Sequence, residues 1–270
     1  MAFSRADVLA AVERSPAAVR VHDRDGWVGA FTPDGRVEDP VGSQPHRGRS
    51  AITRFYDTFI GPRDITFHRD VDIVVGSTVI RDLELEVGMA SGLTMRIPAY
   101  LRYDVAADAG ELKIAALQAF WELPAMVGQF LRSGLRSAPA GLQLSKGLLT
   151  NQGLIGTVGF LSGFRGAGPQ SKRRFQEFLG DARAGDEVAL RRWLGRGSRI
   201  TTGDDVPLAA AELLSRLAGA RPRKLIAAGY SLVVGVDRDG RRDVLTAEIA
   251  AKPFAINRIR YFSEDDEAGD

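Results

Sequence analysis

The sequence predicts an α+β fold in which helices cover one face of a curved antiparallel sheet, and it predicts that this unit occurs twice. Residues 5–121 show helical spacing of apolar residues first and strand-like alternation afterwards. The same order returns, in a weaker form, from residue 171 onward. The 270-residue chain is 44% hydrophobic, which is enough for a substantial core in each unit.

Three helices are expected at the start of the first unit. Residues 4–23 carry apolar side chains at close to helical spacing, with a kink or a restart predicted at Ser15 and Pro16. Residues 23–35 predict a short helix that ends in a Pro-Asp-Gly turn. Residues 48–62 predict a third helix, capped by Ser50.

Four strands are expected to follow these helices. The segments alternate in polarity or are rich in β-branched and aromatic residues, and glycine turns separate them. They cover residues 64–76, 77–92, 93–105 and 112–123. Three helices followed by a meander of strands is an α+β pattern.

The middle of the chain differs from both flanks. Residues 126–176 contain seven Lys or Arg and no Asp or Glu, in an apolar, glycine-rich segment. The preferred interpretation is a helical connector over residues 124–170, packed between the two units. The alternative is an interfacial segment that makes peripheral membrane contact through residues 126–176, with basic side chains facing anionic lipids.

Composition excludes several classes of protein. The net charge of +2 does not favour a nucleic-acid partner, and the absence of cysteine excludes disulfides and thiol chemistry. The histidines His22, His46 and His68 lack metal-ligand spacing, so neither a metal nor a cofactor is expected. Acidic residues interrupt the first apolar run, which is untypical of a signal peptide. A cytoplasmic location is expected, peripheral at the inner face of the membrane if the basic segment binds lipid.

One set of short motifs resembles a known family. The stretches are Val37-Glu38-Asp39-Pro40-Val41-Gly42, Gly48-Arg49, Ile52, Phe55-Tyr56 and Gln118-Ala119-Phe120-Trp121. Their residues and spacing resemble the ketosteroid isomerase branch of the NTF2-like (SnoaL-like) proteins. The resemblance covers about residues 5–123 and implies an NTF2-like cone fold for a domain of residues 1–123. Residues 171–270 are interpreted as a degenerate copy. Family members commonly pair their sheets as dimers, so the chain is expected to form that pair internally; its oligomeric state stays open.

The resemblance implies a steroid delta-isomerase activity. Asp39 would be the general base that moves a proton within a steroid or similar polycyclic enone, and Pro40 would restrict the backbone of Asp39. The two oxyanion donors that this chemistry uses are a tyrosine and a protonated aspartate. Their places hold Ser15 and Ala99 here. Tyr56 is the best remaining donor, against the alternative of a buried tyrosine bonded to the backbone.

An apolar pocket wall is expected beside Asp39. Strand alternation places Leu117, Ala119 and Trp121 on one face, and Ile97 and Ala99 on one face of the neighbouring strand. With Phe55 they form either a plain core or the wall of a cavity, and the resemblance implies the cavity. In the second unit Thr201 or Thr202 stands in the place of the aspartate, and Asp204 and Asp205 are expected in a helix-capping turn.

The expected partner is a small hydrophobic molecule, either a steroid or a polyketide-like compound. A non-catalytic carrier, a polyketide cyclase-like enzyme and an epoxide hydrolase-like enzyme are the alternatives. The first of these needs only the pocket, while the other two also use a pocket carboxylate.

Overall fold

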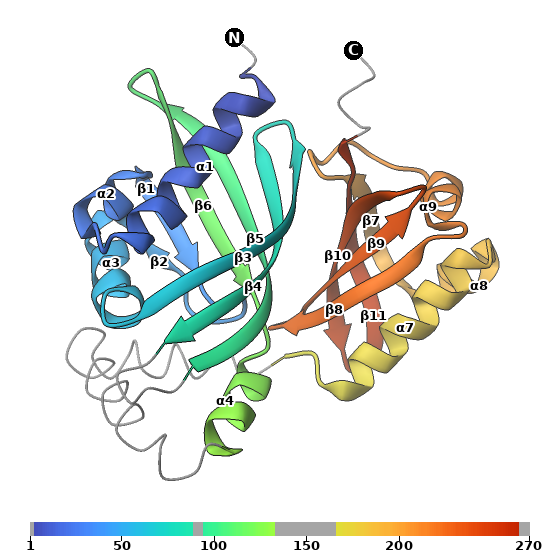
Figure 1. The fold of residues 1–270 in the computed structure, drawn as a ribbon. Helices are drawn as coiled ribbons and strands as arrows, with labels where there is room; N and C mark the ends of the chain where they lie inside the picture. Colours follow the sequence, from blue (N-terminus) through green and yellow to red (C-terminus); the bar gives the residue numbers. More distant parts are fainter. Residues whose placement is uncertain (1–2, 89–93, 133–165, 265–270) are drawn as a thin grey trace.

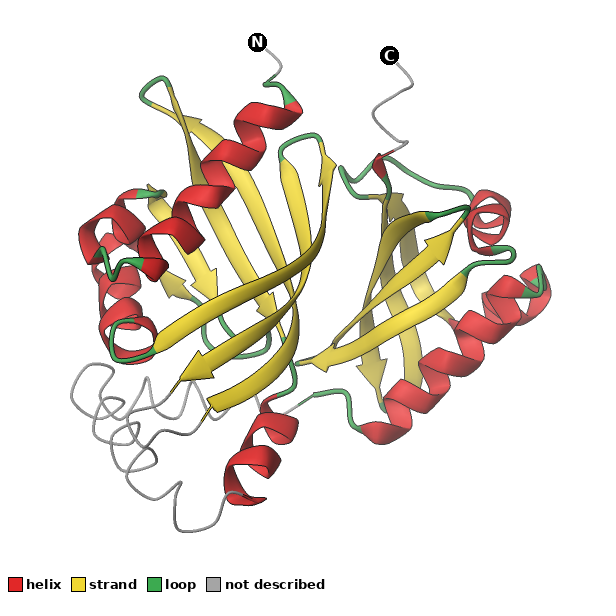
Figure 2. Cartoon of the chain, in the orientation of Figure 1, coloured by secondary structure: helices red, strands yellow, loops and turns green. Residues whose placement is uncertain are grey.

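Two curved sheets pack against each other in the computed structural model of the protein, which describes residues 3–88, 94–132 and 166–264. Helices lie on the outer side of each sheet, and the two sheets meet at the centre of the molecule (Figures 1 and 2). Each sheet is therefore covered on one side by its own helices and on the other by its partner.

The first unit follows the predicted order of helices and strands. Its helices are α1 (Arg5–Arg20), α2 (Arg24–Gly29), α3 (Gly48–Phe55) and the π-helix η1 (Tyr56–Ile60). Its strands are β1 (Phe31–Glu38), β2 (His46–Arg47), β3 (Asp64–Val75), β4 (Thr78–Gly88), β5 (Thr94–Asp108) and β6 (Glu111–Phe120). They form one sheet in the order β2-β1-β6-β5-β4-β3. The meander is antiparallel as predicted, but β1 joins β6 in parallel, so the sheet as a whole is mixed.

The second unit repeats this topology. It comprises α7 (Pro169–Arg183), α8 (Glu187–Trp193), β7 (Leu194–Thr202), α9 (Ala210–Leu217), β8 (Arg221–Ala228), β9 (Ser231–Arg238), β10 (Arg241–Ala251) and β11 (Phe254–Phe262). Its sheet order is β7-β11-β10-β9-β8, again with the first strand parallel to the last. The lengths of equivalent helices also agree between the two units: α1 and α7 have 16 and 15 residues, and α3 and α9 have eight each.

Several local predictions in the first unit are wrong, each for a physical reason. Helix α1 runs through Pro16 without restarting, because Ser15 turns its hydroxyl into the core to accept a hydrogen bond from Trp27. The Pro-Asp-Gly sequence at residues 33–35 lies inside β1, where the register with β6 shifts, and does not end α2. Helix α3 begins at Gly48, so Ser50 is inside the helix and does not cap it.

The interface between the sheets is mostly apolar. Eleven buried residues from both units form one cluster: Val41, Ile73, Val75, Ile80, Tyr100, Phe120, Ile226, Ala228, Val233, Val244 and Phe262. Phe120 and Phe262 are the last residues of β6 and β11, so the two units contribute equivalent positions. This arrangement supports the predicted internal pairing of two sheets within one chain.

Polar contacts fix how the two sheets pair. The Tyr100 hydroxyl donates to the carbonyl oxygen of Lys224 at 2.9 Å and accepts from the backbone N–H of Gly235 at 2.8 Å. The buried carboxylate of Asp82 contacts Lys224 Nζ at 2.5 Å and Arg242 Nη1 at 2.8 Å. These bonds cross from the first sheet to the second, and satisfying buried polar groups in this way specifies one packing over others.

The connector falls largely outside the described residues. Of the segment predicted to be helical, the structure describes α4 (Leu123–Arg132) and the start of α7. The proposed membrane contact through residues 126–176 rests mainly on residues outside the described part. Among the described helices, none has the length and apolar character needed to span a bilayer.

Two glycines bring the units into backbone contact. A Cβ placed on Gly42 would lie 2.5 Å from the Cα of Gly229, and Gly42 has a φ of +96°. The backbone of the loop after β1 therefore rests directly on the turn between β8 and β9, where a side chain has no room.

We expect Gly42→Ala to destabilise the protein strongly, because it adds both a steric clash and left-handed strain. Gly110→Ala is the matched control, since Gly110 has a φ of +89° and a methyl group added there would meet nothing within 4 Å. Strain alone costs about 1–2 kcal/mol, and the clash should raise the loss for Gly42→Ala to at least about 3 kcal/mol. Urea unfolding measures both, and equal losses would contradict the contact.

Candidate active site

The backbone that carries Asp39 is tied to the last strand of the sheet. Parallel pairing places Glu38 opposite Gln118, and the Val41 N–H donates to the carbonyl oxygen of Ala119 at 2.8 Å. The Glu38 carboxylate accepts from the Gly42 N–H at 3.0 Å and from Gln118 Nε2 at 2.9 Å. The chain on both sides of Asp39 is thus fixed by hydrogen bonds.

Asp39 presents its carboxylate to an apolar surrounding with one donor. Trp121 Nε1 donates to Asp39 Oδ1 at 2.6 Å. Burial raises the pKa of Asp39 to about 6, and the hydrogen bond from Trp121 opposes that rise. A carboxyl with this pKa is mostly ionised at neutral pH and is a stronger base than an ordinary aspartate.

A cavity of about 120 Å³ adjoins this carboxylate. Apolar side chains dominate its wall, which comprises Asp39, Phe55, Phe59, Ile60, Arg63, Ile65, Leu85, Val87, Met95, Ile97, Trp121 and Met126. A neighbouring cavity of about 300 Å³ shares Ile97 and Met126 with it. The smaller cavity alone is below the roughly 300–1,000 Å³ of typical ligand sites, so a polycyclic ligand would extend past Met126 into the second space.

Three of the six residues predicted to form the pocket wall line the cavity. Phe55, Ile97 and Trp121 line the cavity beside Asp39. The other three predicted residues, Ala99, Leu117 and Ala119, are buried in the same apolar core but are not among the lining residues. Alternation gave them the correct face of the sheet. It could not show how far along each strand the cavity extends.

Tyr56 lies in the core and not on the cavity wall. Its ring packs 5.5 Å from that of Trp27, and its hydroxyl is buried without a hydrogen-bond partner among the described residues. Consecutive helical residues point about 100° apart, and here Phe55 faces the cavity while Tyr56 faces Trp27. The role of Tyr56 as a donor stays a prediction.

The two places expected to hold oxyanion donors are both within the core. Ser15 accepts from Trp27 Nε1 at 3.1 Å and also shares a hydrogen bond with the Tyr103 hydroxyl. Ala99 is fully buried. Tyr103 lies within β5, on the face that packs under α1.

Arg63 and Met126 are lining residues that the sequence did not reveal. Arg63 follows η1 in a turn, and Met126 belongs to α4 in the segment interpreted as connector. Neither lies on a strand, so alternation gave no signal. Phe59 was detectable in principle, because it follows Phe55 by four residues and their ring centroids are 5.0 Å apart.

Within the described part of the chain, no group of three or more His, Asp or Glu side chains is placed to hold a metal ion. His46 lies in β2 and its ring packs 5.0 Å from that of Phe55. Burial, helped by Arg54, lowers the pKa of His46 to about 4, so its imidazole is neutral at physiological pH. The His46 ring therefore packs against Phe55, which lines the cavity.

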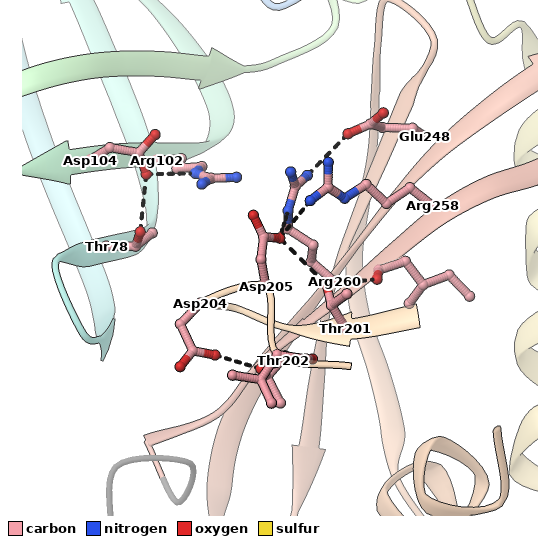
Figure 3. A network of polar contacts seen from close by, with 12 residues as sticks. Thr78, Arg102, Asp104, Thr201, Thr202, Asp204, Asp205, Glu248, Arg258 and Arg260 are labelled. Carbon is pink, nitrogen blue, oxygen red and sulfur yellow. Dashed lines mark hydrogen bonds and ion pairs between the residues drawn. The ribbon is translucent and has the colours of Figure 1, made fainter. Parts of the chain in front are cut away.

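The equivalent site in the second unit has different chemistry. Equating Phe120 with Phe262 places Thr202 where Asp39 stands and Ser263 where Trp121 stands. Asp205 is held by Arg258 at 2.6 Å and Arg260 at 2.7 Å, as Figure 3 shows. Although burial opposes them, these arginines lower the pKa of Asp205.

Asp204 and Asp205 do not cap the following helix. Helix α9 has Ala209 at its N-cap, without a side-chain hydrogen bond, so the capping prediction is wrong. The two acids lie instead in a turn that Thr202 and the arginines stabilise (Figure 3). An aspartate held by two arginines is a weak base, which agrees with a second unit that lacks the site.

Comparison with known proteins supports the assignment of the first unit. Residues 12–116 match the family model described as the SnoaL-like domain. A Δ5-3-ketosteroid isomerase from Mycobacterium sp. is 29% identical with a TM-score of 0.41, and the match covers 44% of this chain and 96% of that one. A Mycobacterium tuberculosis protein solved with estradiol-17β-hemisuccinate is 25% identical with a TM-score of 0.40, over 44% and 95% of the two chains.

A putative polyketide cyclase from Xanthomonas campestris pv. campestris is 17% identical with a TM-score of 0.41, over 46% of this chain and 97% of that one. All three solved structures match over less than half of this chain and almost all of their own. The motif, the order of elements and the family model agree over the same residues. The match to the SnoaL-like domain model therefore lies within the first unit, over residues 12–116 of this chain.

Proposed function

We propose that the SnoaL-like domain is an isomerase-like enzyme that acts on a steroid or a similar polycyclic enone, with Asp39 as the proton-transferring base. One observation carries the proposal: the carboxylate of Asp39 borders an apolar cavity, with a pKa raised to about 6 and Trp121 holding one oxygen. Proposed domain limits are residues 1–123 for this unit, 124–170 for the connector and 171–270 for the second unit.

The chemistry requires one carboxylate that can first accept and then return a proton. Asp39 would take a proton from the carbon between the carbonyl and the double bond, and return it to the far carbon of the conjugated system. Apolar walls favour the delocalised enolate over solvated charges and hold the flat ring system. Trp121 fixes one carboxylate oxygen, which leaves the other oriented toward the ligand.

The second candidate is a non-catalytic carrier for a hydrophobic ligand. The lack of a free donor at the two expected oxyanion positions favours it. The Ser15 hydroxyl is hydrogen-bonded to Trp27 within the core, and Ala99 has no side-chain donor. Loss of one such donor typically costs 10²–10³ in rate. A polyketide cyclase-like or epoxide hydrolase-like reaction would use the same carboxylate, so all the enzymatic alternatives share their first test.

We expect Asp39→Asn to lower the conversion of a Δ5-3-ketosteroid at least about 10²-fold, because it removes the base. Asp34→Asn, on an exposed residue of β1, is the matched control and should keep the wild-type rate. Absorbance of the conjugated product measures both. Wild-type conversion at the background rate, together with tight binding of the steroid, would favour the carrier instead.

The rate should rise with pH through about 6 and level off above it, because only ionised Asp39 accepts a proton. Trp121→Phe removes the hydrogen bond that lowers this pKa. The midpoint of the pH–rate curve of this variant should therefore move to higher pH. The pH dependence of kcat/KM for both proteins checks the direction. A midpoint that stays in place or moves down in Trp121→Phe would contradict the arrangement.

Tyr56→Phe should stabilise the protein or leave it unchanged, since it removes a buried hydroxyl that has no partner among the described residues. Tyr103→Phe is the comparison, because it breaks the bond to Ser15 and should cost about 1 kcal/mol. Thermal unfolding measures both variants. The conversion rate of Tyr56→Phe tests its predicted donor role directly, with a tenfold loss expected for a donor.

A further inference from the structure

The wall of the Asp39 cavity contains one cation. Of the twelve lining side chains, only Asp39, Arg63 and Trp121 carry nitrogen or oxygen atoms. The Trp121 N–H is already used on Asp39. Arg63 is therefore the one lining residue whose side chain can still offer charged donors to a ligand.

Arg63 is partly buried without an acidic partner among the described residues. Its Nη1 donates to the carbonyl oxygen of Thr58 at 2.7 Å, which fixes the direction of the guanidinium. The ion pairs of the described chain do not include Arg63, although many other arginines form them. Burial lowers the pKa of Arg63, and no neighbouring carboxylate offsets this effect.

Asp39 and Arg63 border the same cavity without forming an ion pair, so a ligand can contact both. A guanidinium keeps its charge in proteins, and its planar fork matches the two oxygens of a carboxylate. Thr58 occupies Nη1 alone, which leaves donors on Nη2 and Nε. An acidic ligand group beside Arg63 would supply the missing partner, while the apolar body of the ligand would contact the apolar wall that Asp39 also borders.

We propose that Arg63 is an anion-binding, specificity-determining residue, and that the cavity selects apolar ring compounds that carry a carboxylate able to reach Arg63. This inference rests on the proposed function only in taking the cavity as the ligand site. It adds a class of ligand, an amphipathic acid, that the general hydrophobic pocket does not imply.

The test compares acids with their methyl esters, which differ in charge and little in shape. Two pairs are used, a fused bicyclic enone acid and a 3-ketosteroid acid substituted on the D ring, so that ligand size does not decide the result. Binding to the full-length protein is measured by quenching of tryptophan fluorescence, since Trp121 lines the cavity. All measurements are repeated in Asp39→Asn, which separates binding from turnover.

Wild type should bind at least one acid tenfold or more tightly than its ester, and Arg63→Met should lose that preference. Arg63→Lys should keep part of it, because the charge remains without the fork. Arg54→Met is the matched control: it removes the same charge from the exposed side of α3 and should keep the wild-type preference.

Equal binding of acid and ester by wild type in both pairs would overturn the proposal. It would also be overturned if folded Arg63→Met kept the preference, or if Arg63→Met lowered the conversion of neutral enones as much as that of acids. The last result would assign Arg63 to the reacting carbonyl. Acid binding without conversion would contradict the isomerase and leave the inference about Arg63 supported.

Discussion

The first sheet is buried on both faces where it meets the second unit, and much of the structure depends on this constraint. One face of β5 packs in the cone beneath the helices, where Ala99 and Tyr103 lie, and the next residue along, Tyr100, enters the interface with the second sheet. Strand alternation makes both possible with one backbone. At the cavity, Met95 and Ile97 of β5 face the apolar wall while Arg96 and Pro98 on the other face are exposed, so the strand itself separates the cavity from water.

The cavity is organised by the same strand that carries the interface. Strand β6 pairs with the end of β1 next to Asp39, contributes Phe120 to the contact between the units and is followed directly by Trp121. Asp39 therefore receives its position from β6 and its hydrogen bond from the residue after it. The elevated pKa follows from that placement, because a carboxylate among apolar side chains with a single donor is incompletely solvated.

The order of elements in the fold and the position of Asp39 beside the cavity could be predicted because both depend on local patterns. Alternation and the motif at residues 37–42 placed Asp39, Ile97 and Trp121 correctly, and the order of elements predicted the repeat. Arg63 and Met126 could not be predicted, since a turn residue and a helix beyond the sheet reach the cavity only through tertiary packing. Tyr56 packs against Trp27 in the core, a contact between two helices that the local pattern did not indicate.

The contact between Gly42 and Gly229 has a consequence for how such a chain can evolve. The second unit has Thr202 at the position equivalent to Asp39, yet its turn at Gly229 is the surface on which the Asp39 loop rests. Selection can therefore relax on the inner residues of the second unit while it stays strict on the face that meets the first. A duplicated domain that began as an equal partner would persist as a support, free to change its interior and unable to be deleted.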